Sequence, residues 1–145
     1  MTRIHETVVI ARPVNEVFAF VASAKDWPSW HSTMLEAEQT SPGEVGVGAT
    51  FRGVNREMGM RMPWTSKATA YEPNRKWGET ITSGSTLIQE SLTFEPLGAG
   101  TMFKQEYDVQ VGGALRVLAP VVTASMRRQM KGNLARLKAI LEGRA

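Results

Sequence analysis

The segment GALRVLAPVVTASMRRQMKGNLARLKAILEG, residues 113–143, determines what the rest of the chain has to form. Its apolar residues recur at steps of three and four, which places them on one stripe of an α-helix. These residues are Leu115, Leu118, Val122, Met126, Met130, Leu134, Leu137 and Leu141. Pro120 interrupts the pattern and predicts either a kink near Ala119 or a short helix followed by a long one. We therefore expect a long C-terminal helix that needs a large apolar surface to lie on.

The apolar stripe changes character along its length. Its last turns carry Leu and Ile, whereas its early part carries Val122, Met126 and Met130. Methionine is unbranched and adaptable, so it fills irregular core space and also lines sites for apolar ligands. We expect looser packing at Met126 and Met130 than at Leu134 and Leu137.

Length and composition restrict the class of protein. The 145 residues predict a single domain, 1–145, and the absence of cysteine excludes disulfides, thiolate zinc sites and thiol nucleophiles. The formal net charge is only +3, and no motif interleaves basic with exposed aromatic residues, so we expect no nucleic-acid partner. The sequence shows no signal-peptide pattern and no apolar run of about 18 residues. We expect a soluble cytoplasmic protein without a membrane span; a homo-oligomer is left open.

The chain before the C-terminal segment predicts mainly strands. Residues 3–11 alternate, Pro13 opens a short amphipathic helix that ends near Ser23, and residues 25–30 form a second very short helix or turn. From Met34 the apolar period is two. Six further strands are expected over residues 34–40, 47–58, 62–71, 77–83, 86–94 and 102–111. Turn signals about every ten residues favour an antiparallel meander, so the layout is α+β.

Several segments together resemble a known superfamily. They are VIARPVNEVFAFV (9–21), WPSW (27–30), VGVG (45–48), YEPNR (71–75) and NLARLK (133–138). Their order resembles the START-related, pollen-allergen-like (SRPBCC) superfamily, in particular its polyketide cyclase/dehydrase-type branch. The resemblance implies a helix-grip fold: a seven-stranded curved antiparallel sheet wrapped around a long C-terminal helix, two short helices between the first two strands, and a cavity for apolar molecules. Lipid carriers, hormone receptors, aromatic cyclases, oxygenase domains and co-chaperones share this superfamily, so the fold leaves the function open.

Polar residues interrupt otherwise apolar strand faces. Glu90 shares a face with Ile88, Leu92 and Phe94; Gln105 shares one with Phe103, Tyr107 and Val109; and Glu79 shares one with Trp77 and Ile81. If these faces are concave, Glu90, Gln105 and Tyr107 point towards the helix, where burial would raise the pKa of a carboxyl group and suit it to general acid or base chemistry. The alternative is a stability role, with these groups exposed at an edge or paired with Arg52, Arg56 or Lys104.

The predicted ligand-binding residues combine these polar groups with aromatic and helical side chains. They are Trp30, Phe51, Trp64, Trp77, Glu90, Phe94, Gln105, Tyr107, Val122, Met126 and Met130. Core packing is the alternative role for each of the apolar ones. His31 follows Trp30 at the expected cavity mouth, where it could titrate near pH 6.5; a solvent-exposed histidine at a helix end is the alternative.

Three functions fit these patterns. The first is binding of a small hydrophobic ligand, lipid-like, aromatic or polyketide-like, between the sheet and the C-terminal helix. The second is a polyketide cyclase or dehydratase in which Glu90, Tyr107 or His31 moves protons, a chemistry that needs no cofactor. The third is a co-chaperone-like interaction module with an exposed apolar patch.

Metal and nucleotide chemistry lack support in the sequence. Its two histidines, His5 and His31, have no carboxylate partner at ligand spacing, and no phosphate-binding or dinucleotide-binding glycine motif is present. We expect no metal and no cofactor.

Overall fold

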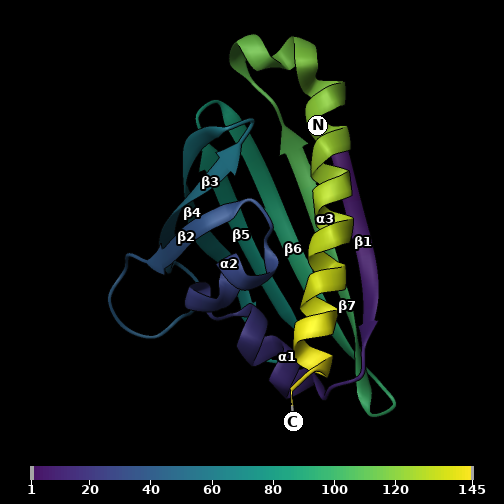
Figure 1. Ribbon diagram of the computed structural model, residues 1–145. Coiled ribbons are helices and arrows are strands. Elements are labelled where there is room, and N and C mark those ends of the chain that lie inside the picture. Colours follow the sequence, from purple (N-terminus) through teal and green to yellow (C-terminus); the bar gives the residue numbers. More distant parts are fainter. Residues whose placement is uncertain (1, 145) are drawn as a thin grey trace.

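A computed structural model describes residues 2–144 as a curved seven-stranded antiparallel sheet with one long helix lying against it (Figure 1). The strands are β1 (Thr2–Ile10), β2 (Met34–Gln39), β3 (Thr50–Glu57), β4 (Met60–Glu72), β5 (Lys76–Ser83), β6 (Thr86–Leu97) and β7 (Gly100–Gln110). Their hydrogen-bonded order is β1-β7-β6-β5-β4-β3-β2, so the first strand of the chain pairs with the last. The long helix α3 (Ala119–Glu142) has 24 residues. This architecture is the helix-grip fold that the resemblance implies.

Three short helical segments connect β1 to β2. They are α1 (Val14–Val21), the 3-10 helix η1 (Ala24–Asp26) and α2 (Trp27–Trp30). Pro13 caps the start of α1, where the amide donor that proline lacks is not needed. The α1 helix lies near the C-terminal end of α3 (Figure 1), and the Arg144 guanidinium stacks over the Phe20 ring at 4.5 Å. These segments close one end of the space between the sheet and α3.

The C-terminal segment follows the second of the two expected courses. A 3-10 helix, η2 (Gly113–Leu118), precedes α3, and Pro120 lies in the first turn of α3, where no backbone donor is lost. The prediction that Leu115 and Leu118 belong to the buried stripe is wrong, since they are 39% and 51% exposed. A 3-10 helix has three residues per turn, so the helical spacing of α3 does not extend back across it.

A solid apolar core fills the end of the fold near α1 and α2. Leu134, Leu137 and Leu141 of α3 are buried there against aromatic side chains from the sheet and the small helices. The rings of Phe18 and Phe94 lie 5.0 Å apart, and Phe94 lies 5.0 Å from Phe103. Close packing of this kind leaves little space for a ligand at this end.

The curvature of the sheet has local causes. A register shift in β4 between Ala68 and Ala70 marks a bulge, which bends a strand and increases its twist. Gly53 of β3 lets the Trp64 ring lie close over the backbone. A Cβ atom at position 53 would overlap that ring and lie 2.5 Å from the Glu36 carbonyl oxygen. The sheet therefore keeps a large aromatic side chain on its inner face.

Candidate functional site

A row of polar side chains crosses the inner face of the sheet. It runs from Ser66 on β4 through Glu79 on β5 and Glu90 on β6 to Gln105 and Tyr107 on β7. In the register, Glu79 lies directly opposite Glu90, and Glu90 directly opposite Tyr107. Directly opposed residues of antiparallel strands point to the same face, with Cβ atoms about 4.5–5.5 Å apart. We call Glu79 and Glu90 the carboxyl pair and all five residues the polar row.

Hydrogen bonds connect the polar row across four strands. The Ser66 hydroxyl donates to Glu79 Oε2 at 2.9 Å, and Gln105 Nε2 donates to Glu90 Oε2 at 3.0 Å. Gln105 Nε2 also lies 3.4 Å from the Tyr107 hydroxyl. Glu79, Glu90 and Gln105 are 5%, 8% and 1% exposed, so the centre of the row is buried.

Burial raises the pKa values of both members of the carboxyl pair. Burial raises the pKa of Glu79 well above its ordinary value, and the charge of Glu90 and a hydrogen bond to it raise this pKa further, against hydrogen bonds from Ser66 and Trp77. Burial also raises the pKa of Glu90, but hydrogen bonds from Glu79, Gln105 and Tyr107 oppose the rise. Of the two carboxyl groups, Glu79 therefore has the pKa that is raised more and holds a proton more strongly. Burial, then the charges of Glu90 and Glu79, raise the pKa of Tyr107, so its hydroxyl remains a donor.

Two of the basic residues considered as alternative partners of the polar row, Arg52 and Lys104, pair with other acidic residues. Arg52 bonds to Glu36 and Glu38, each at 2.8 Å, and Lys104 pairs with Glu106 at 3.4 Å. The Glu90 carboxylate is instead held by Gln105 and Tyr107. The negative charge of the row is thus stabilised by neutral donors.

Beyond the polar row, burial between the sheet and α3 is uneven: Ile4, Val109 and Thr123 are buried there, but other side chains are not. Ile81 and Ile88 follow the row on the inner faces of β5 and β6, Tyr107 is the last member of the row on β7, and Val122 and Met126 belong to the first turns of α3. All five are only partly buried, although they pack against the core. Inward-facing side chains of two packed layers are normally buried, so packing between the two layers is less complete at these five residues. We call these five residues the open end.

The polar row lies at the boundary between the solid core and the open end. On β5, Glu79 separates buried Trp77 from half-buried Ile81, and on β6 Glu90 stands between buried Leu92 and half-buried Ile88. The same change occurs in α3, where Met126 is half-buried and Met130 is 2% exposed. A molecule that entered at the open end would meet apolar side chains first and the polar row last.

The remaining predicted ligand-binding residues occupy different places. Trp30, Phe51, Trp77 and Phe94 lie in the solid core, each at most 2% exposed. Trp64 is also buried, and its indole nitrogen donates to Asn55 Oδ1 at 2.9 Å.

His31 is neither exposed nor part of the polar row. Its ring is half-buried and stacks on Trp30 with 3.9 Å between centroids, and its Nδ1 atom lies 3.5 Å from Asn133 Nδ2. Burial lowers the pKa of His31 to about 3, so the ring is neutral at pH 7. The alternative of a solvent-exposed histidine is corrected: α3 covers this helix end.

Glu79 and Ser66 are not among the residues predicted for the site. The alternation of β5 does place Glu79 on one face with Trp77 and Ile81. The strand register, which no local pattern contains, is needed to set Glu79 against Glu90 and to bring Ser66 beside it.

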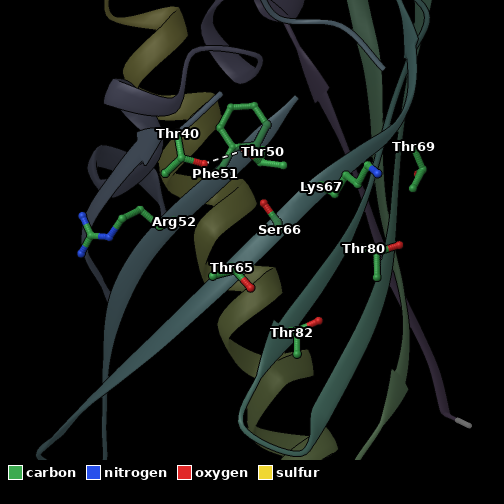
Figure 2. A pocket seen from close by; sticks show the side chains of 10 residues that line it. All are labelled: Thr40, Thr50, Phe51, Arg52, Thr65, Ser66, Lys67, Thr69, Thr80 and Thr82. Atoms are coloured by element: carbon green, nitrogen blue, oxygen red, sulfur yellow. Dashed lines mark hydrogen bonds between the residues drawn. The ribbon is translucent and has the colours of Figure 1, made fainter. Parts of the chain in front are cut away.

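A separate hollow of about 500 Å³ lies on the outer face of the sheet. Figure 2 shows its lining side chains on β3, β4 and β5, with α3 behind the sheet. The lining residues are Thr40, Thr50, Phe51, Arg52, Thr65, Ser66, Lys67, Thr69, Thr80 and Thr82. Its hydroxyls bond to near neighbours, as in the 2.7 Å contact between Thr40 and Thr50. This hydrated, threonine-rich groove differs in character from the interior, where the carboxyl groups are buried.

The helix-grip fold and its partly open interior define the START-like class of proteins. Residues 1–142 match the family described as "Polyketide cyclase / dehydrase and lipid transport", and the chain belongs to that family. No curated protein matches the chain in sequence.

Solved structures of similar fold cover nearly the whole chain. A START superfamily protein from Mycobacterium smegmatis has 15% identity and a TM-score of 0.83, with 97% of each chain covered. The protein TTHA0849 from Thermus thermophilus has 15% identity and a TM-score of 0.81, with 95% of each chain covered. Ara h 8.0201 has 15% identity and a TM-score of 0.77, with 99% of each chain covered. At these identities the likeness concerns the fold alone.

Two features of other site classes are missing from the part of the chain that the structure describes. Residues 2–144 contain no group of three or more His, Asp and Glu side chains that could hold a metal ion. Over the same residues, no helix is long and apolar enough to cross a membrane.

Proposed function

We propose that the protein binds a small, mainly apolar molecule between the sheet and the first half of α3. The observation that carries this proposal is the open end: inward-facing apolar side chains that stay half-buried beside a buried, hydrogen-bonded polar row. Ligand sites for small molecules generally combine apolar walls with a few placed polar groups. The family description, which includes lipid transport, supports a lipid-like, aromatic or polyketide-like ligand.

Nile red, a neutral apolar dye, tests the binding proposal. Ile88 is half-buried at the open end, so Ile88→Trp should fill the space and weaken dye binding about tenfold or more. Val121 is 67% exposed on the same helix as Met126, so Val121→Trp adds the same side chain outside the site and serves as the matched control. Equal dye binding by both variants and the native protein would overturn the proposal. Native mass spectrometry of the purified protein would identify a retained ligand.

The carboxyl pair favours a second function, a cofactor-independent cyclase or dehydratase. Glu79 and Tyr107, whose pKa values are raised well above the ordinary ones, are donors beside Glu90, whose pKa is raised less because hydrogen bonds oppose the effect of burial. In such a reaction, the Glu90 carboxylate takes a proton from a carbon next to a carbonyl group, and Tyr107 or Glu79 donates a hydrogen bond to the enolate oxygen that forms. The resulting enol carbon attacks a second carbonyl of the same molecule, and the proton on Glu90 returns to the new alkoxide.

A substitution at Glu90 distinguishes catalysis from binding. Glu90→Gln keeps the shape of the side chain and removes the base, so turnover of a poly-β-carbonyl substrate should fall by about 10²-fold or more while Nile red still binds. Unchanged turnover in Glu90→Gln would remove Glu90 from the reaction. His31, the third candidate, stacks on Trp30 away from the polar row, and the proposal assigns it no step.

A further inference from the structure

The interior holds two buried carboxyl groups, Glu79 and Glu90, that no cation of the described chain contacts. The ion pairs within residues 2–144 all lie at the surface, and none includes Glu79 or Glu90. Glu6 of β1 lies opposite Gln105 in the register, so a further half-buried acid flanks the row on its inner face. A buried carboxylate without a counter-charge is costly, and a positive group would stabilise it.

A second, independent feature is an unused hydrogen-bond acceptor in the same place. Gln105 is 1% exposed, and its Oε1 atom has no hydrogen-bond partner among the described residues. The orientation of the amide follows from its neighbours, because Nε2 donates to Glu90 Oε2. The opposite orientation would turn the amide oxygen towards a carboxylate. Buried acceptors are nearly always satisfied, so Oε1 calls for a donor that the described residues do not supply.

The two features require the same chemistry from a ligand. Glu90 and Gln105 Oε1 both offer hydrogen-bond acceptors, and the carboxyl group of Glu90 can carry a negative charge. An ammonium group offers several donors, no acceptor and a positive charge, and hydrogen bonds between charged groups are the strong ones. The open end, with Ile88 and Met126, would take the apolar part of the same molecule.

We propose that the ligand is an apolar amine, bound as its ammonium form by the Glu90 carboxylate and Gln105 Oε1; this inference rests on the proposed binding function. A carboxylic acid would meet Glu90 as a like charge, so fatty acids and other apolar anions are poor ligands. The whole protein has a formal net charge of +3, so long-range attraction would favour anions. A preference for amines would therefore come from the site itself.

Three naphthalene derivatives of similar size test this inference by isothermal titration calorimetry at pH 7. They are 1-naphthylmethylamine, a cation; 1-naphthalenemethanol, a neutral donor; and 1-naphthylacetate, an anion. The amine should bind about tenfold or more tightly than the alcohol, since its hydrogen bonds are charge-assisted. The acid should bind weakest of the three. This ranking requires only the native protein.

Three substitutions test whether Glu90 and Gln105 cause the preference for the amine. Glu90→Gln should abolish the advantage of the amine over the alcohol, a ratio of two affinities that a general loss of binding would not change. Glu95→Gln removes the same charge from an exposed position on the same strand, so it should keep the full preference. Gln105→Met preserves the volume but removes the unused acceptor, and it should reduce the preference by a smaller factor.

The outcomes separate this inference from the proposed function. Equal binding of the three probes, or tightest binding of the acid, would overturn the amine inference while the binding site stands. An amine preference that persists in Glu90→Gln would place the cation elsewhere and also overturn it. If neither the naphthalene probes nor Nile red binds, the proposed function and the inference fail together.

Discussion

Replacing Glu79 with glutamine should reduce the loss of folding stability that accompanies a rise in pH. Glu79 is 5% exposed, and burial and the neighbouring Glu90 raise its pKa well above the ordinary value. The folded protein therefore holds a proton on Glu79 at pH values where the unfolded chain has released it. The contribution of Glu79 to the free energy of unfolding is therefore largest below its pKa in the unfolded chain. It declines as the pH rises from there towards the pKa of Glu79 in the folded protein. Glutamine resembles the protonated side chain and has no proton to lose.

The size of the effect follows from proton linkage. One proton contributes about 1.4 kcal/mol per pH unit to the free energy of unfolding within this window. From about pH 4.5 upward, Glu79→Gln should gain stability relative to the native protein at up to this slope, until the folded pKa is passed. Groups distant from Glu79, His31 included, titrate in both proteins and cancel in the difference, whereas Glu90 is coupled to Glu79 and contributes to it.

Urea unfolding between pH 4.5 and pH 8.5, followed by circular dichroism, measures this difference directly. Glu95→Gln is the matched control: this exposed residue on the same strand should give a difference within about 0.5 kcal/mol that does not change with pH. A flat difference for Glu79→Gln, or one in which the native protein gains with rising pH, would refute the reasoning that burial holds a proton on Glu79.

Further predictions concern packing and a second titrating group. Leu137 is fully buried, so Leu137→Ala should lower the free energy of unfolding by about 2–5 kcal/mol. Met126 is half-buried, so Met126→Ala should lower the free energy of unfolding by roughly half of that amount or less, but it should alter Nile red binding. Equal large losses in urea unfolding would indicate a solid core at both positions. Gly53→Ala should cost about 1–3 kcal/mol or more by thermal unfolding, because the new Cβ meets the Trp64 ring and a backbone oxygen; a native-like Tm would contradict this. Burial lowers the pKa of His31 to about 3. Below pH 6.5 the free energy of unfolding of the native protein should therefore fall by up to about 1.4 kcal/mol per pH unit relative to His31→Gln. A pH-independent difference in urea unfolding would count against the burial of His31.

The sequence alone determined the layers of this protein. The stripe through Leu134, Leu137 and Leu141 predicted the long helix, and the period of two from Met34 onward predicted the strands. These patterns are readable because burial on one face imposes the period of the local backbone. The alternation of Phe103, Gln105 and Tyr107 likewise put a polar group on an inner face before any partner strand was known.

Tertiary structure decided what those inner-face groups became. Glu79 and Glu90 are eleven positions apart, and only the β5–β6 register sets them side by side, where Glu90 raises the pKa of Glu79 beyond the effect of burial. Contact with α3 and Asn133, a hundred positions away, turns His31 from an exposed candidate into a half-buried neutral ring. The solvation and charge of these residues depend on segments that are distant in the chain. Local periodicity does not show which distant segment packs against them.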